Sequence, residues 1–174
     1  MKYVFAIMFG LFFVSANAQE INKKLEDQIK HKQIMLNECS REGLVEFPEF
    51  KASYDANYEN YKVDSASVPQ LTKLMKDKKI KVVLGTWCGD SKFQVPNFLK
   101  VTDAVKVDEK NVSFIAVDGA KKAENGLIDG LDIQRVPTFI ITDKKGKEIG
   151  RIIEHPKKSL ELDLIDILSV KKTK

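Results

Sequence analysis

A short apolar run in this chain passes directly into a helical pattern, and this junction restricts the folds open to it. Residues 80–85 are rich in β-branched side chains and end in a glycine, which is typical of a buried strand. From residue 91 to 107 the apolar side chains recur at helical spacing, and Phe98, Val101 and Val105 fall on one face. A strand that leads straight into a helix predicts an α/β fold, in which helices pack on a sheet.

The same alternation continues along the chain. Helices are predicted at residues 68–78 and after Ser159, a suitable N-cap residue. Further strands are predicted at residues 112–117, 138–142 and 148–153. Residues 120–132 hold two glycines and are predicted to be either a helix or a turn-rich segment. Together these elements predict one mixed sheet that is covered by helices on both faces.

Residues 20–62 are predicted to be helical. Two apolar stripes recur at helical spacing, and their members are Ile21, Leu25, Ile29, Leu36 and Cys39, then Phe47, Phe50, Tyr54, Tyr58 and Tyr61. We interpret both stripes as helices packed on the domain, with a ligand-facing aromatic wall as the alternative for the second. This divides the chain after its first eighteen residues into a helical extension, residues 19–62, and an α/β domain, residues 63–174.

The first eighteen residues have the pattern of a secretory signal peptide. A lysine precedes an apolar run at residues 3–14, and Ala-Asn-Ala at residues 16–18 is a small-x-small cleavage site. The run is too short to span a bilayer as a helix, and Gln19 offers no thiol for a lipid anchor. We expect cleavage after Ala18 and an exported mature protein that has no stable membrane anchor.

Composition excludes several classes of function. The formal net charge is +4, and no block of basic residues is interleaved with aromatic ones, so nucleic acid is not an expected partner. Two cysteines and two histidines without ligand spacing predict neither a metal site nor a bound cofactor.

Reactive side chains concentrate at the turn after the strand at residues 80–85. Cys88 lies where the predicted helix begins. The unpaired N–H groups and the positive dipole end at the N-terminus of a helix stabilise an anion. We therefore expect this thiol to ionise more readily than a free cysteine. Ser91 is placed to donate its hydroxyl to the thiolate, whereas the carboxylate of Asp90 opposes a second negative charge.

This turn resembles the active site of the thioredoxin superfamily. Trp-Cys-Gly at residues 87–89 matches the start of the family motif Trp-Cys-Gly-Pro-Cys, and Pro96 matches the proline that kinks the active-site helix. Residues 132–138 resemble the segment that carries the family's cis-proline. The ending Gly-Asp-Ser is similar to that of a subgroup of exported bacterial relatives. The resemblance covers about residues 67–168 and implies a thioredoxin-like mixed β-sheet flanked by helices.

The resemblance also implies roles for individual residues. Cys88 takes the place of the nucleophile and Trp87 covers the site. Val136 and Pro137 would face Cys88, and their backbone would pair with an extended substrate segment. The implied partners are disulfide-containing or thiol proteins and peptides, with an external thiol as reductant. The resemblance favours the periplasm over the surrounding medium.

Two departures from the family pattern leave the mechanism open. Ser91 replaces the second cysteine, and Val82 stands where relatives carry a buried acid. Cys88 is then predicted to act as a monothiol in thiol–disulfide exchange, of reductase or isomerase type, with an outside thiol to resolve the mixed disulfide. Two alternatives remain: Cys39 is a distant resolving partner, or the fold is a non-catalytic peptide-binding or chaperone module. A peroxidase is disfavoured because the Pro-x-x-x-Thr-x-x-Cys context is missing. Cys39, on an apolar stripe, is interpreted first as a buried structural thiol.

Overall fold

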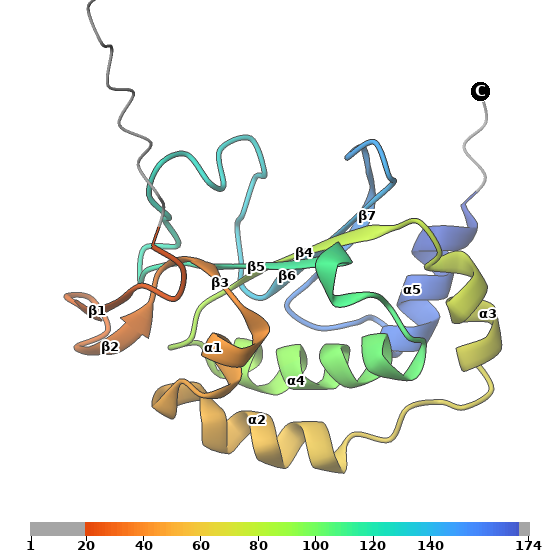
Figure 1. The fold of residues 1–174 in the computed structure, drawn as a ribbon, viewed down its shortest axis with the longest axis horizontal. Helices are drawn as coiled ribbons and strands as arrows, with labels where there is room; N and C mark the ends of the chain where they lie inside the picture. The colour runs from red at the N-terminus through yellow and green to blue at the C-terminus, as the bar shows by residue number, and fades with distance from the viewer. Residues whose placement is uncertain (1–19, 171–174) are drawn as a thin grey trace, which may run out of the picture.

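A five-stranded mixed sheet forms the centre of the protein, in the order β3-β5-β4-β6-β7 (Figure 1). The computed structural model describes residues 20–170, so the predicted signal peptide lies outside the described residues. The strands are β3 (Asn37–Cys39), β4 (Lys79–Leu84), β5 (Val112–Ala116), β6 (Thr138–Thr142) and β7 (Glu148–Ile153). The central strand β4 is parallel to β5 and antiparallel to β6, and β3 runs antiparallel to β5 at one edge.

Helices flank this sheet, as the sequence predicts, but they do not cover both of its faces: their buried apolar side chains lie in one core, and the segment between β5 and β6 packs on the other face. The helical elements are α1 (Arg41–Val45), α2 (Pro48–Asn60), α3 (Val68–Leu74), α4 (Gly89–Ala104), η1 (Glu109–Asn111) and α5 (Leu160–Ser169). Helix α4 runs beneath the sheet and α2 runs beneath α4, whereas α3 packs against α5 (Figure 1). The aromatic stripe is confirmed as a helix, α2, whose Phe50 and Tyr54 are buried.

The prediction of a helix over residues 20–39 is wrong. This stretch forms β1 (Lys24–Asp27) and β2 (Lys32–Met35), which pair as an antiparallel hairpin, and then β3 of the main sheet. Asn22, His31 and Asn37 have φ values of 64°, 51° and 70°, and such left-handed residues interrupt a helix. The spacing of the apolar residues matched a helix by coincidence, because each strand buries its own side chains against different neighbours.

The segment between β5 and β6 is turn-rich. Lys121, Asn125, Gly126, Gly130 and Asp132 all have positive φ, which excludes a continuous helix over residues 120–132. This segment packs Ala123, Ile128, Leu131 and Ile133 against a small buried cluster that consists of Val83, Val117 and Val136. Trp87 and Cys88 contact the same cluster, so this smaller core supports the thiol turn.

The larger core joins α4 to the sheet. The rings of Phe98 and Phe139 stack with their centroids 4.3 Å apart, and both side chains are fully buried. Burying one such ring contributes roughly 2–3 kcal/mol to the free energy of unfolding. The middle of α4 is thereby held against β6 of the sheet.

Candidate thiol site

Cys88 lies at the point where the chain leaves β4 and enters α4. It is the N-cap residue of α4, with φ −85° and ψ 129°, and its N–H donates to Gly85 O at 2.9 Å. Its side chain is partly exposed. Cys88 Sγ lies 3.2 Å from Val136 O and donates a hydrogen bond to it. The thiol is therefore accessible at the start of a helix, as a nucleophile at this turn requires.

The structure brings the predicted proline segment to this thiol across 48 residues of sequence. The peptide bond between Val136 and Pro137 is cis. Val136 is buried in the small core, and Thr138 Oγ1 donates to Arg135 O at 2.6 Å. The turn before β6 is thus fixed by packing and hydrogen bonding, with a carbonyl group pointing at the sulfur.

Trp87 is held in one orientation beside the thiol. Its Nε1 donates to Val117 O at 3.0 Å, and its ring lies against the backbone of Gly85. A Cβ on Gly85 would lie 2.7 Å from Trp87 Cε2, closer than van der Waals contact permits. Glycine at position 85 therefore allows the indole to fold over the end of β4.

Ser91 has a role in the fold that the sequence analysis did not predict. It is fully buried, and its Oγ accepts a hydrogen bond from Gly85 N at 3.2 Å, so it fastens α4 to the end of β4. The hydrogen bonds of the described residues do not include one from Ser91 to Cys88, and a donor role toward a thiolate stays a prediction. Asp90 is exposed in the first turn of α4.

Cys39 is separated from this site. It lies on β3, two strands from β4 and thus about 10 Å away from it, whereas Cys88 contacts Val136 on the β6 side. A disulfide needs Cα atoms within about 7 Å, so the geometry disfavours Cys39 as a resolving partner. Both thiols are free. Burial raises the pKa of Cys39 to about 12, as expected for an inert core thiol.

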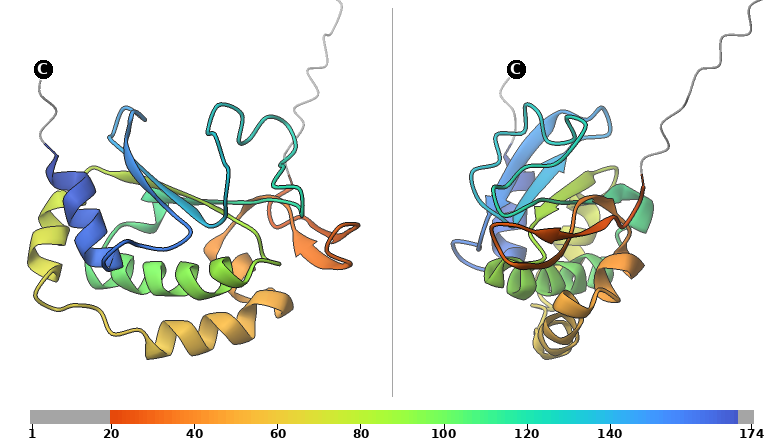
Figure 2. Two further views of the ribbon diagram at one scale, coloured as in Figure 1. Left: turned by 180° about the vertical axis from the view of Figure 1, so that it is seen from behind. Right: turned by 90° about the vertical axis from the view of Figure 1, so that its left-hand side faces the viewer.

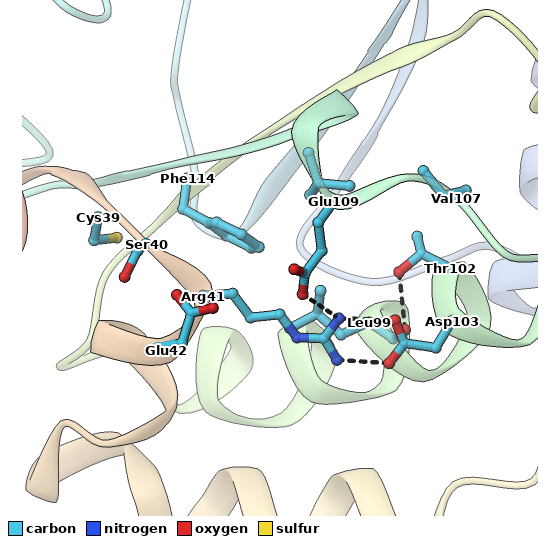
Figure 3. Close-up of a pocket in the computed structure, with 11 residues that line it drawn as sticks. Cys39, Ser40, Arg41, Glu42, Leu99, Thr102, Asp103, Val107, Glu109 and Phe114 are labelled. Carbon is cyan, nitrogen blue, oxygen red and sulfur yellow. Dashed lines mark hydrogen bonds and ion pairs between the residues drawn. The ribbon is translucent and has the colours of Figure 1, made fainter.

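Cys39 instead borders a cavity of about 210 Å³ near α1 and α4 (Figure 3). Arg41 there makes a bidentate ion pair with Asp103, at 2.5 and 2.8 Å, and its Nη1 lies 3.2 Å from Glu109 Oε1. Tyr58 donates its hydroxyl to Asp103 at 2.6 Å. Because these polar groups already satisfy one another, we interpret the cluster as a structural link between α1, α2 and α4.

Sequence analysis missed three residues beside the thiol turn, Asp27, Lys30 and Gly119, and it missed the hydrogen bond that Thr86 of the turn itself accepts. Lys30 Nζ lies 4.1 Å from the centroid of the Trp87 ring, and Thr86 Oγ1 accepts from Met35 N at 3.1 Å. Asp27 and Lys30 were missed because residues 20–39 were predicted to be a helix, whereas they contain the β1–β2 hairpin. A turn-forming Asp-Gln at residues 27–28 was the available signal.

Residues 20–170 contain no group of three or more His, Cys, Asp and Glu side chains that is arranged to hold a metal ion. Within the same residues, no helix combines the length and the apolar character needed to cross a membrane.

A family model described as Thioredoxin matches residues 45–166. The chain belongs to the thioredoxin family. Membership supports a thiol–disulfide redox role and thiol-containing substrates, and it agrees with a partly exposed cysteine at the start of α4. No functionally curated protein has a significantly similar sequence.

Two solved structures share the fold at low sequence identity, and a third is similar over a smaller part of the chain. A Pseudomonas aeruginosa protein of unknown function is 15% identical, with a TM-score of 0.56, and the match covers 75% of this chain and 89% of that one. An HIV epitope-scaffold protein is 16% identical, with a TM-score of 0.51 and coverage of 71% and 84%. Mitochondrial thioredoxin 3 of Saccharomyces cerevisiae is 24% identical over 58% of this chain and 86% of its own, with a TM-score of 0.33.

Proposed function

We propose that this protein is an exported monothiol thiol–disulfide exchange protein in which Cys88 is the nucleophile. The observation that carries the proposal is the pairing of a partly exposed Cys88 at the start of α4 with a fully buried serine, Ser91, one helical turn later. A thioredoxin-family dithiol enzyme places its resolving cysteine at that second position. The signal-peptide pattern of residues 1–18 supports export, and the resemblance to exported bacterial relatives favours the periplasm.

The exchange begins with attack of the Cys88 thiolate on one sulfur of a substrate disulfide. A bond forms between Cys88 Sγ and that sulfur, the substrate S–S bond breaks, and the other substrate sulfur leaves as a thiolate. An external thiol then attacks the mixed disulfide and releases Cys88 as a thiolate. If that external thiol is a third cysteine of the same substrate, it bonds to the substrate sulfur and the product is an isomerised disulfide. If it is a small thiol, the substrate sulfur is left in a mixed disulfide with that thiol; a second molecule of the small thiol then attacks, which reduces the substrate and leaves the small thiol as its own disulfide.

Residues around the sulfur suit each part of this exchange. Cys88 is the N-cap residue of α4, so the positive end of the helix dipole favours the developing thiolate. The resemblance implies that an extended substrate segment pairs with the backbone of Val136. Trp87 is partly exposed beside the sulfur and packs on the small apolar cluster, so its ring forms the adjoining surface.

Trapping the mixed disulfide tests the proposal. The mature protein is incubated with a disulfide-bonded peptide, quenched with acid and analysed by mass spectrometry. We expect one peptide adduct on Cys88 in the wild type and in Cys39→Ala, and none in Cys88→Ala. Release of the adduct should rise in proportion to the concentration of added small thiol, because no internal thiol competes.

The absence of an adduct on Cys88 would point to a different function. If wild-type Cys88 forms no adduct while the protein still retains an unfolded peptide, and Cys88→Ala retains that peptide equally well, the exchange proposal is wrong. The non-catalytic peptide-binding or chaperone module would then be the function. N-terminal sequencing of the protein secreted by an expressing bacterium tests export separately, and an intact Met1 would contradict it.

A further inference from the structure

The β1–β2 hairpin lies at the end of the sheet where the thiol turn is found (Figure 2). Its first anchor is Asp27, which is only 4% exposed. The Asp27 carboxylate accepts from the N–H groups of Ile29 and Lys30 at 2.9 and 2.6 Å, which closes the hairpin turn, and from Gly119 N at 2.8 Å. Although burial alone would raise it, these hydrogen bonds hold the pKa of Asp27 below its usual range.

Close packing supports the same anchor. A Cβ on Gly119 would lie 2.7 Å from Asp27 Oδ1 and 2.9 Å from Ile29 Cβ. The chain after β5 therefore has no room for a side chain at position 119, and the hairpin rests directly on its backbone. Val117, two residues earlier, is the residue that accepts the indole hydrogen bond of Trp87.

The second anchor joins the other strand of the hairpin to the thiol turn itself. Met35 N donates to Thr86 Oγ1 at 3.1 Å, and both residues are fully buried. Thr86 lies two residues before Cys88. The hairpin is thus fastened to both loops that surround the sulfur, the one after β4 and the one after β5.

Lys30, in the turn of the hairpin, completes the contact. Its ammonium group lies over the Trp87 ring, 4.1 Å from the centroid. Within residues 20–170 this ammonium makes no salt bridge of 4.0 Å or less, and its charge acts on the Asp27 carboxylate only at longer range. The nitrogen therefore keeps hydrogen-bond donors for a ligand, at a point that a substrate covering Trp87 must pass.

We propose that the β1–β2 hairpin is a wall of the thiol site and that Lys30 is its specificity-determining residue, which selects disulfide substrates bearing an anionic group near the reactive sulfur. The inference rests on the proposed exchange through Cys88 and names the substrate class of that site. A carboxylate beside the substrate cystine meets the Lys30 ammonium while the disulfide lies over Trp87 toward Cys88.

Solvent screening limits how much Lys30 can change the rate of reaction with an anionic substrate. A charge pair at a solvent-exposed site contributes at most about 1 kcal/mol, which corresponds to about a five-fold change in rate. The effect acts on the approach of the substrate, so it should weaken with salt as the Debye length falls to about 3 Å near 1 M. A neutral disulfide has nothing to gain from Lys30.

Two matched small disulfides test this selection. Dithiobis(nitrobenzoate) carries two carboxylates and dithiodipyridine is neutral at pH 7, and both release a coloured thiol when Cys88 attacks. We expect Lys30→Gln to slow the anionic probe about three- to five-fold and the neutral probe less than two-fold. Lys30→Arg should restore the wild-type ratio, and high salt should remove it. Lys122→Gln is the control, because it removes an exposed lysine that lines the same hollow as Ile29.

Each other result has its own meaning. If Lys30→Gln slows both probes equally, Lys30 acts on the thiol or on the fold and the selection is wrong. If Lys30→Gln slows neither probe, or if Lys122→Gln changes the ratio of the two rates equally, the hairpin does not discriminate substrates by charge and the inference is also wrong. If wild-type Cys88 reacts with neither probe, the proposed exchange itself fails, and the inference falls with it.

Discussion

Cys88 Sγ lies 3.2 Å from the carbonyl oxygen of Val136 and donates a hydrogen bond to it. A thiolate has no proton to donate, so only the thiol form can make this hydrogen bond. It also places the sulfur against the backbone segment on which an extended substrate is expected to lie. A substrate strand that pairs with this segment is therefore brought directly to the nucleophile, and the predictions below follow from this arrangement.

The two cysteines should differ sharply in reactivity. Burial holds the pKa of Cys39 at about 12, so only about one Cys39 thiol in 10,000 is ionised at pH 8. Iodoacetamide at pH 8 should modify Cys88 alone in the folded protein, and both cysteines in urea. Peptide mapping by mass spectrometry measures this. Modification of Cys39 at a rate similar to that of Cys88 under native conditions would contradict the burial.

Gly85→Ala should move the indole of Trp87. The new Cβ would lie 2.7 Å from Trp87 Cε2, and such overpacking costs about 1–3 kcal/mol of unfolding free energy. The chain has a single tryptophan, so its fluorescence should shift to the red and become more accessible to acrylamide.

Gly89→Ala is the matched control for that experiment. A Cβ there meets no atom within 4 Å, and alanine suits a helix better than glycine. This variant should keep the wild-type fluorescence and lose no stability in urea. Equal behaviour of the two variants would show that Trp87 does not rest on Gly85.

Ser91→Cys should convert the protein into a dithiol reductase. The new thiol would lie one helical turn from Cys88, where attack on the mixed disulfide becomes intramolecular, and effective molarities of oriented groups reach about 10⁵ M or more. We expect the trapped adduct to disappear and reduction of a model protein disulfide to become catalytic. Val82 limits the gain, because a buried acid that would accept the proton is missing.

Ser91→Ala is the control that separates the effect of the new thiol from the effect of losing the Ser91 hydroxyl. It removes the acceptor for Gly85 N and should cost about 1 kcal/mol, while the adduct on Cys88 still accumulates. A Ser91→Cys protein that keeps as much adduct as the wild type would show that position 91 cannot reach the mixed disulfide.

The link between Arg41 and Asp103 should make stability depend on pH. Burial alone would raise the pKa of Asp103, but hydrogen bonds from Arg41 and Tyr58 hold it below its usual range. The folded pKa is thus lower than the unfolded value of about 3.9. The stabilisation is complete above that value and is lost as the pH falls through the folded pKa.

Asp103→Asn should therefore reduce the unfolding free energy by about 1–2 kcal/mol at pH 7, a range that allows for solvent screening of this partly exposed pair. The difference from the wild type should shrink in urea titrations as the pH falls below about 4. Asp77→Asn is the control: this residue is exposed, and asparagine accepts its φ of 59°. A difference for Asp103→Asn that stays constant with pH would contradict the ion pair.

Sequence alone determined the strand–turn–helix unit around Cys88 and the strands that follow it. Those elements are encoded by local signals: a β-branched run for β4, apolar spacing for α4, and Ser159, whose Oγ accepts from Leu162 N at 3.2 Å and caps α5. Such signals act within a few residues, where side-chain spacing and backbone capping decide the structure.

Tertiary structure decided residues 20–39 and the residues that surround the thiol. An apolar stripe shows that side chains are buried, but it does not say whether a helix or several strands bury them. The contact between Lys30 and Trp87 and that between Met35 and Thr86 join segments more than fifty residues apart. Their partners are chosen by how the hairpin packs on the sheet, and no local pattern carries that information. For the same reason the motif did not show that Ser91 Oγ accepts a hydrogen bond from Gly85 N.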